Sequence, residues 1–79
     1  MLLTELAQHH HAIIEHINAS IEEQLQLNAI GICPQARIQK IAQSYGTQPI
    51  LVCTAQDSRF AIGYDLAAKI KVSLPIQEL

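Results

Sequence analysis

Residues 2–27, LLTELAQHHHAIIEHINASIEEQLQL, decide the fold that the sequence predicts. Large aliphatic side chains recur in this stretch at steps of three and four residues, a spacing typical of one face of an amphipathic helix. The sequence therefore predicts a long N-terminal helix over residues 2–27. Its aliphatic face would hold Leu3, Leu6, Ile13, Ile14, Ile17, Ile21 and Leu25.

His10 falls near the centre of this aliphatic face, where an isoleucine or a leucine is expected. A buried imidazole needs a hydrogen-bond partner, whereas an imidazole at an interface makes association sensitive to pH. Three interpretations of His10 stay open: a core histidine, an interface residue and a functional group. On the predicted helix His9 and His11 fall on opposite flanks, so the three consecutive histidines do not form a single metal-binding motif there.

The rest of the chain predicts a short second helix. Pro34 suits the first position of a helix over about 34–45, and Gly46 suits the stop that follows it. Within this segment Ile38, Ile41, Ala42 and Tyr45 have the apolar spacing of a one-faced helix.

Three strands are expected after this helix. Residues 50–54 are rich in β-branched side chains and apolar on both faces, as an inner strand is, and 59–64 alternate as the second arm of a hairpin. Residues 70–74 predict a third strand, which Pro75 ends. The expected fold is a single α+β domain over 1–79, with the long N-terminal helix and the short second helix packed on a small, three-stranded, mainly antiparallel sheet in the order α-α-β-β-β.

Composition limits the class of protein. The chain is 49% hydrophobic and 15% charged, with a formal net charge of −2. It has no run of about 18 uncharged apolar residues and no basic start followed by an apolar run, so we expect neither a membrane span nor a signal peptide. We expect a cytoplasmic protein, in which Cys33 and Cys53 stay reduced.

Motifs for catalysis are missing from the sequence. It contains no Gly-rich phosphate loop, no paired carboxylates in opposed environments and no Ser–His–Asp arrangement. The predicted helix 34–45 would place Cys33 at a helix N-terminus, where a thiol is activated, but no nearby base accompanies it. We therefore expect a protein that is not an enzyme and that uses no cofactor and no metal.

The predicted long helix favours a role in protein–protein interaction. A helix over 2–27 would be about 40 Å long, whereas strands of about five residues span under 20 Å, so part of the helix would extend beyond the sheet. We expect a small module that acts as a homodimer, or as an accessory subunit, adaptor or inhibitor of a larger complex. Its predicted interface residues are His10, Ile13, Ile14, Ile17 and Ile21.

Nucleic-acid binding is the alternative function. All five Lys and Arg residues lie after residue 23, and the predicted helix 34–45 with the hairpin 50–64 resembles part of a winged helix. Arg37, Lys40 and Arg59 would then contact the anionic ligand. Five basic residues are few for a protein whose affinity comes from neutralising phosphates, so a protein partner is favoured over nucleic acid.

Overall fold

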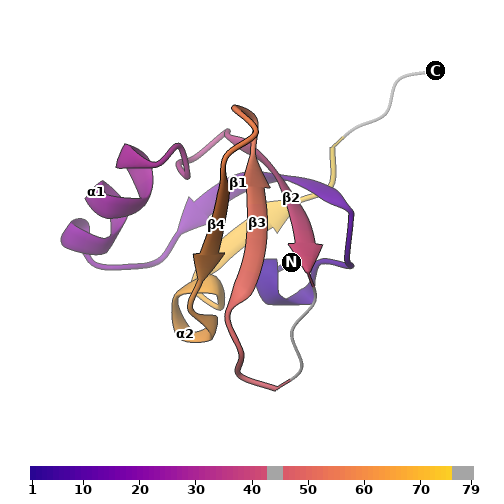
Figure 1. The fold of residues 1–79 in the computed structure, drawn as a ribbon. Coiled ribbons are helices and arrows are strands. Elements are labelled where there is room, and N and C mark those ends of the chain that lie inside the picture. Colours follow the sequence, from indigo (N-terminus) through magenta and orange to yellow (C-terminus); the bar gives the residue numbers. More distant parts are fainter. Residues whose placement is uncertain (43–45, 76–79) are drawn as a thin grey trace.

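An antiparallel β-sheet organises the part of the chain that the structure, a computed structural model, describes: residues 1–42 and 46–75 (Figure 1). Within these residues the sheet has five strands in the order β4-β3-β2-β1-β5, and every neighbouring pair is antiparallel. The strands are β1 (His11–Ile17), β2 (Arg37–Ala42), β3 (Ile50–Thr54), β4 (Arg59–Ile62) and β5 (Ile70–Ser73). A 3₁₀ turn, η1 (Leu3–Glu5), and two helices, α1 (Ile21–Ala29) and α2 (Tyr64–Ala67), complete the described elements.

The predicted long helix over 2–27 is wrong, and with it the three-stranded α-α-β-β-β arrangement. The segment instead forms η1, β1 and α1 in succession. The misleading periodicity has its cause in a β-bulge. Ile14 lies opposite Val72 and His16 lies opposite Lys71, so two steps along β1 match one step along β5.

The bulge changes the spacing of the inward-facing side chains of β1. Ala12, Ile14 and Ile17 are all buried, so the core positions follow one another at steps of two and then three residues. A regular strand has a strict period of two, and this irregular spacing fits a helical pattern better. Ile21, which extended the apparent helical face, belongs to α1 and is 76% exposed.

Helix α1 begins at a capping box that lies inside the stretch expected to be one continuous helix. The Ser20 hydroxyl accepts a hydrogen bond from the Glu23 backbone N–H (3.2 Å), and the Glu23 carboxylate accepts one from the Ser20 backbone N–H (3.2 Å). These bonds satisfy two N–H groups that the start of a helix leaves unpaired. The pKa of Glu23 is lowered, first by the backbone hydrogen bond from Ser20.

The predicted helix 34–45 is also wrong over its described residues, because Arg37–Ala42 form β2; Tyr45 lies outside the described residues. Pro34 occupies a tight turn instead of a helix start. Ala36 N–H donates to the Cys33 carbonyl (3.0 Å), and Gln35 has a φ of 73°, as the third residue of a type II turn does. Proline at the second position of such a turn is favoured for its fixed φ.

The strands at 50–54, 59–62 and 70–73 agree with the sequence prediction. β3 has the predicted bounds, and its place between β2 and β4 confirms that it is an inner strand. β4 ends at Ile62, two residues earlier than expected, because α2 begins at Tyr64. Turn chemistry and β-branched residues are local signals, and they were sufficient in this half of the chain.

The core lies on the inner face of the sheet, under η1 and α2. Helix α1 lies beside the sheet (left in Figure 1) and reaches the core through Leu27, its one buried side chain. The core is aliphatic, and every strand contributes at least one large buried side chain from its inner face. Its members with less than 2% exposure include Leu3, Ile14, Ile32, Ile38, Val52, Ile70 and Val72. No helix among the described residues is long and apolar enough to cross a membrane.

Candidate partner-binding surface

The three consecutive histidines lie between η1 and the start of β1. His9 has a φ of 69°, in the left-handed region, and its N–H donates to the Lys40 carbonyl (2.6 Å). The Gln39 side-chain amide donates to the His9 carbonyl (2.9 Å), and Lys40 N–H donates to the His10 carbonyl (3.1 Å). The backbone of this segment is therefore held against β2, while all three imidazoles are exposed.

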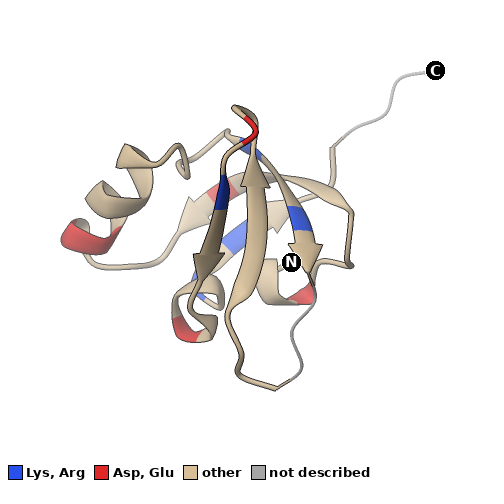
Figure 2. Ribbon diagram, viewed as in Figure 1, with Lys and Arg blue, Asp and Glu red and all other residues tan. Residues whose placement is uncertain are grey.

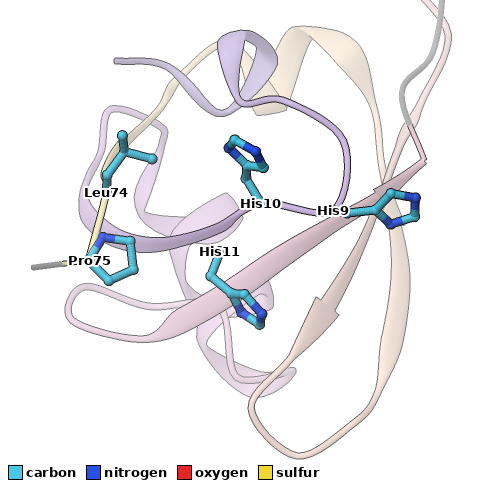
Figure 3. A pocket seen from close by; sticks show the side chains of 5 residues that line it. All are labelled: His9, His10, His11, Leu74 and Pro75. Carbon is cyan, nitrogen blue, oxygen red and sulfur yellow. The ribbon is translucent and has the colours of Figure 1, made fainter. Parts of the chain in front are cut away.

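The histidines line an open hollow of about 530 Å³ together with Leu74 and Pro75 (Figure 3). Their rings point in three different directions, with His9 directed away from the hollow's centre. Within residues 1–42 and 46–75 no three His, Cys, Asp or Glu side chains form a group that could hold a metal ion. A helical wheel does not describe these histidines, because they precede or begin a strand.

The five predicted interface residues do not form one surface. His10 is exposed in the loop before β1, and Ile13 is half-buried on the outer face of the sheet. Ile14 (0% exposed) and Ile17 (3% exposed) fill the chain's own core. Of the five residues, Ile21 is the aliphatic one whose side chain is open to solvent, because it lies on the exposed side of α1.

Helix α1 carries an exposed apolar ridge made of Ile21 and Leu25. The two side chains are 76% and 63% exposed and lie one helical turn apart, so they are neighbours on the helix surface. The sequence placed both residues on the aliphatic face of the predicted helix 2–27, packed on the sheet or on a partner, and named Ile21 as an interface residue. In the structure they lie on the shorter α1, whose contact with the core is made by Leu27.

The three predicted anion contacts lie in different environments. Arg37 begins β2 and Arg59 begins β4, and both are exposed. Lys40 is buried, with 1% exposure, and its ammonium donates to the carbonyls of Leu6 (2.7 Å) and Thr4 (3.3 Å). Burial lowers the pKa of Lys40. Its expected place on the surface is therefore wrong, since its charge serves to fix η1 against β2.

Basic residues are spread over several strands and do not gather at one place on the ribbon (Figure 2). Acidic residues lie on η1, β1, α1, α2 and the tip of the β3–β4 hairpin (Figure 2). Between described residues one ion pair is present, from Lys69 to Glu23 at 4.0 Å. Nucleic-acid binders need clustered positive charge along their contact surface, and this distribution does not supply it.

A second hollow, of about 360 Å³, lies on the outer face of the sheet. It follows a row of directly opposed residues in which His11 faces Gln39 and Gln39 faces Cys53, and Asp57 of the hairpin turn borders it. The Cys53 thiol donates weakly to the Asp57 carboxylate (3.5 Å). Desolvation raises the pKa of Cys53, and Asp57 raises it further through this hydrogen bond and its negative charge.

Replacing Asp57 by asparagine is expected to make Cys53 react faster with iodoacetamide. The raised pKa keeps the thiol protonated at a given pH, and only the thiolate attacks. Removing the negative charge lowers that pKa, so alkylation near pH 8 should be several-fold faster than in the parent protein. Mass spectrometry in a Cys33→Ser background isolates the signal of Cys53. An equal or slower rate would contradict the assigned role of Asp57.

Residues 1–74 match the FeoA domain family. The chain belongs to the FeoA family. No significant match was found among curated protein sequences. The five-stranded sheet therefore has a family context that the sequence patterns had not indicated.

Two solved FeoA structures resemble this family member over most of their length. One, described as the iron uptake regulatory protein FeoA, is 29% identical, with 91% of this chain and 93% of that chain covered and a TM-score of 0.81. The other is Stenotrophomonas maltophilia FeoA complexed with zinc, 25% identical, with 92% of this chain and 89% of that chain covered and a TM-score of 0.75. That protein is described as a prokaryotic SH3 domain protein, proposed to be an activating factor for bacterial ferrous iron transport.

The same fold occurs as part of a larger regulator. A manganese-dependent transcriptional repressor in complex with manganese is 19% identical, with 92% of this chain but 35% of the repressor covered, and a TM-score of 0.80. At this identity the likeness shows the fold alone. The FeoA domain is thus an SH3-like small β-fold, in place of the long-helix module that the sequence predicted.

Proposed function

We propose that the chain is a non-catalytic accessory protein of ferrous iron transport, which acts in the cytoplasm by binding another protein of the transport system. The observation that carries this proposal is the match of residues 1–74 to the FeoA family. The description of the S. maltophilia relative as a possible transport activating factor supports it. The general prediction of a small accessory module agrees with the family, and the transport partner is the specific proposal.

The ridge of Ile21 and Leu25 on α1 is the surface that we assign to the partner. A large aliphatic side chain left in water forgoes about 1.5–3 kcal/mol of burial free energy, so two adjacent ones favour a covering protein. Glu22 lies beside the ridge, and Lys69, the basic residue that reaches α1, is paired with Glu23 at 4.0 Å. The ridge therefore suits an apolar groove with a basic rim more than an anionic membrane or nucleic acid.

Replacing Ile21 and Leu25 together by serine is expected to reduce ferrous iron uptake to the level of a strain that lacks the protein. Both side chains are exposed, so the melting temperature should stay close to that of the parent protein. Uptake of radioactive Fe²⁺ by the complemented deletion strain measures the effect. Gln26→Ser, on an exposed position of the same helix, is the matched control and should keep full uptake.

The outcomes separate the function from the surface. Normal uptake in the deletion strain would contradict the proposed function. Impaired uptake in the deletion strain, with full recovery by the double variant, would contradict the assignment of α1. A homodimer remains a prediction, and sedimentation as a monomer at high protein concentration would contradict it.

A nucleic-acid function is not proposed. It depended on a helix over 34–45, and the described residues 37–42 of that segment form β2. It also depended on Lys40, whose ammonium is buried against two carbonyls. The likeness to a repressor covers a third of that protein and shows the fold only.

A further inference from the structure

The two edges of the sheet differ in how they are covered. Along β5 the N-terminal residues form an additional pairing: Val72 N–H donates to the Met1 carbonyl (2.7 Å), the Met1 ammonium donates to the Val72 carbonyl (3.1 Å), and Leu2 bridges to Lys71. Along β4, at the opposite edge, no other described strand pairs. An uncovered edge presents free N–H and C=O groups that can pair with another chain.

The register identifies which groups of β4 face outward. Thr54 N–H donates to the Ser58 carbonyl (2.8 Å), and the pairing continues with Val52 opposite Phe60. Hydrogen-bonded and non-hydrogen-bonded pairs alternate along an antiparallel ladder. The N–H and C=O groups of Phe60 therefore point toward β3, and those of Arg59 and Ala61 point away from it. No backbone hydrogen bond from another described residue reaches these outward groups.

A hollow of about 480 Å³ lies beside this edge, between the end of α1 and the β3–β4 hairpin. Phe60, which is half-buried and packs against the core, forms part of its wall. At the hairpin end the hollow narrows, because the Gln56 side chain lies close to Gly31. A Cβ added at Gly31 would lie 3.4 Å from the Oε1 atom of Gln56. The hollow is lined by Asn28, Ala29, Ile30, Gly31, Thr54, Gln56, Ser58 and Phe60.

Arg59 gives this edge a charge preference. Its side chain is exposed on the outer face of the sheet, opposite Cys53, and it has no ion-pair partner among the described residues. Strand β4 itself, with the sequence Arg59-Phe60-Ala61-Ile62, contains no acidic residue. A second copy pairing through β4 would therefore offer no acidic side chain from that strand to Arg59.

We propose that the open edge of β4 binds an extended segment of another protein as a sixth strand. Its backbone pairs with the outward groups of Arg59 and Ala61. An acidic side chain of the segment lies beside Arg59 on the outer face, and the next side chain, which is apolar, enters the hollow beside Phe60. Alternation of side chains along a strand sends neighbouring residues to opposite faces, so the preferred segment alternates acidic and apolar residues.

The proposal names the chemistry of a partner segment, and its biological setting rests on the proposed function. The probes are two blocked peptides, Thr-Val-Glu-Val-Thr and Thr-Val-Lys-Val-Thr, titrated into the purified full chain. Amide hydrogen exchange followed by NMR reports pairing directly. With the glutamate peptide we expect slower exchange at the N–H groups of Arg59 and Ala61, and several-fold weaker binding of the lysine peptide.

Two variants sharpen the test. Arg59→Glu should reverse the preference in favour of the lysine peptide. Ala61→Pro removes an outward N–H group, so it should abolish binding of both peptides. The fold should be retained, because this N–H group makes no hydrogen bond to β3 and proline is tolerated at a sheet edge. Lys71→Glu, on the covered edge strand β5, is the matched control and should bind both peptides as the parent does.

Absence of saturable binding at about 1 mM peptide would overturn the proposal, since weaker contact is not specific recognition. Protection located elsewhere in the chain, or an unchanged preference in Arg59→Glu, would also overturn it. Slow exchange at Arg59 and Ala61 without peptide, with dimers in sedimentation, would assign the edge to a second copy instead. Peptide binding and iron uptake are separate readouts, so failure of one is distinguishable from failure of the other.

Discussion

Lys40→Ala is expected to lower the free energy of unfolding by about 3 kcal/mol, the scale for removing a buried charged group from its hydrogen-bonded partners. The Lys40 side chain is 1% exposed, and its ammonium donates to the carbonyls of Leu6 and Thr4. Alanine leaves both carbonyls without this donor and opens a cavity between η1 and β2. Urea unfolding followed by circular dichroism measures the change.

Lys40→Met separates packing from charge. Methionine nearly fills the space but donates no hydrogen bond, so we expect a smaller loss of about 1–2 kcal/mol. Lys71→Ala is the control, because Lys71 is exposed on β5 and its loss should change stability by less than about 0.5 kcal/mol. An equal effect of Lys40→Ala and Lys71→Ala would contradict a structural role for the buried ammonium.

The same lysine predicts a pH dependence. Desolvation lowers the pKa of Lys40 in the folded state below its ordinary value of 10.5. Between the two pKa values the unfolded chain binds more protons, so the contribution of Lys40 to stability rises with pH over this window. It is smallest below the folded pKa and levels off above 10.5. The stability of the parent relative to Lys40→Met should therefore increase as the pH rises toward 10.5.

Ile14→Ala is expected to destabilise the protein by about 2–5 kcal/mol, whereas Ile13→Ala should cost well under half of that. On a helix both side chains would lie on one apolar face. On β1 they point to opposite faces of the sheet: Ile14 is fully buried, and Ile13 is half-buried on the outer face. Thermal and urea unfolding of the two single variants provides the comparison. Similar losses in both would favour the helical arrangement over the strand.

The C-terminal half of the sheet was predictable because its signals are local. The hairpin of β3 and β4 has β-branched strands around a polar turn, and β5 alternates regularly between buried and exposed residues. In the N-terminal half the deciding contacts lie far away in the sequence. The bulge in β1 depends on the pairing of β1 with β5. Nothing in the sequence near His16 indicates that two steps along β1 match one step along this distant strand.

β2 was missed for a second physical reason. Its inward-facing residues are Ile38 and Lys40, and a lysine at a core position interrupts the apolar alternation that identifies a strand. The carbonyls that accept its hydrogen bonds belong to Thr4 in η1 and to Leu6, which follows η1, and they come close to Lys40 only in the folded chain. The start of α1, by contrast, had a readable signal: Ser20 followed three residues later by Glu23 is a capping box.

The candidate site was only partly predictable. Ile21 and Arg59 were named from the sequence, and both are exposed at the surfaces for which we propose partners. That Arg59 lies at an open sheet edge was not predictable, because the outward direction of its backbone N–H and C=O groups follows from the register of β4 with β3. Leu25 was assigned to a packed face, and its exposure follows from Leu27 making the contact of α1 with the core.

The position of β1 between β2 and β5 has a consequence for how the chain is made. β1 is synthesised before the other described strands, whereas β5, which pairs with one of its edges, is synthesised after them. Until then one row of backbone N–H and C=O groups on β1 is unpaired. Folding dominated by such distant pairings is slow, so the nascent domain depends on β5 to close the sheet.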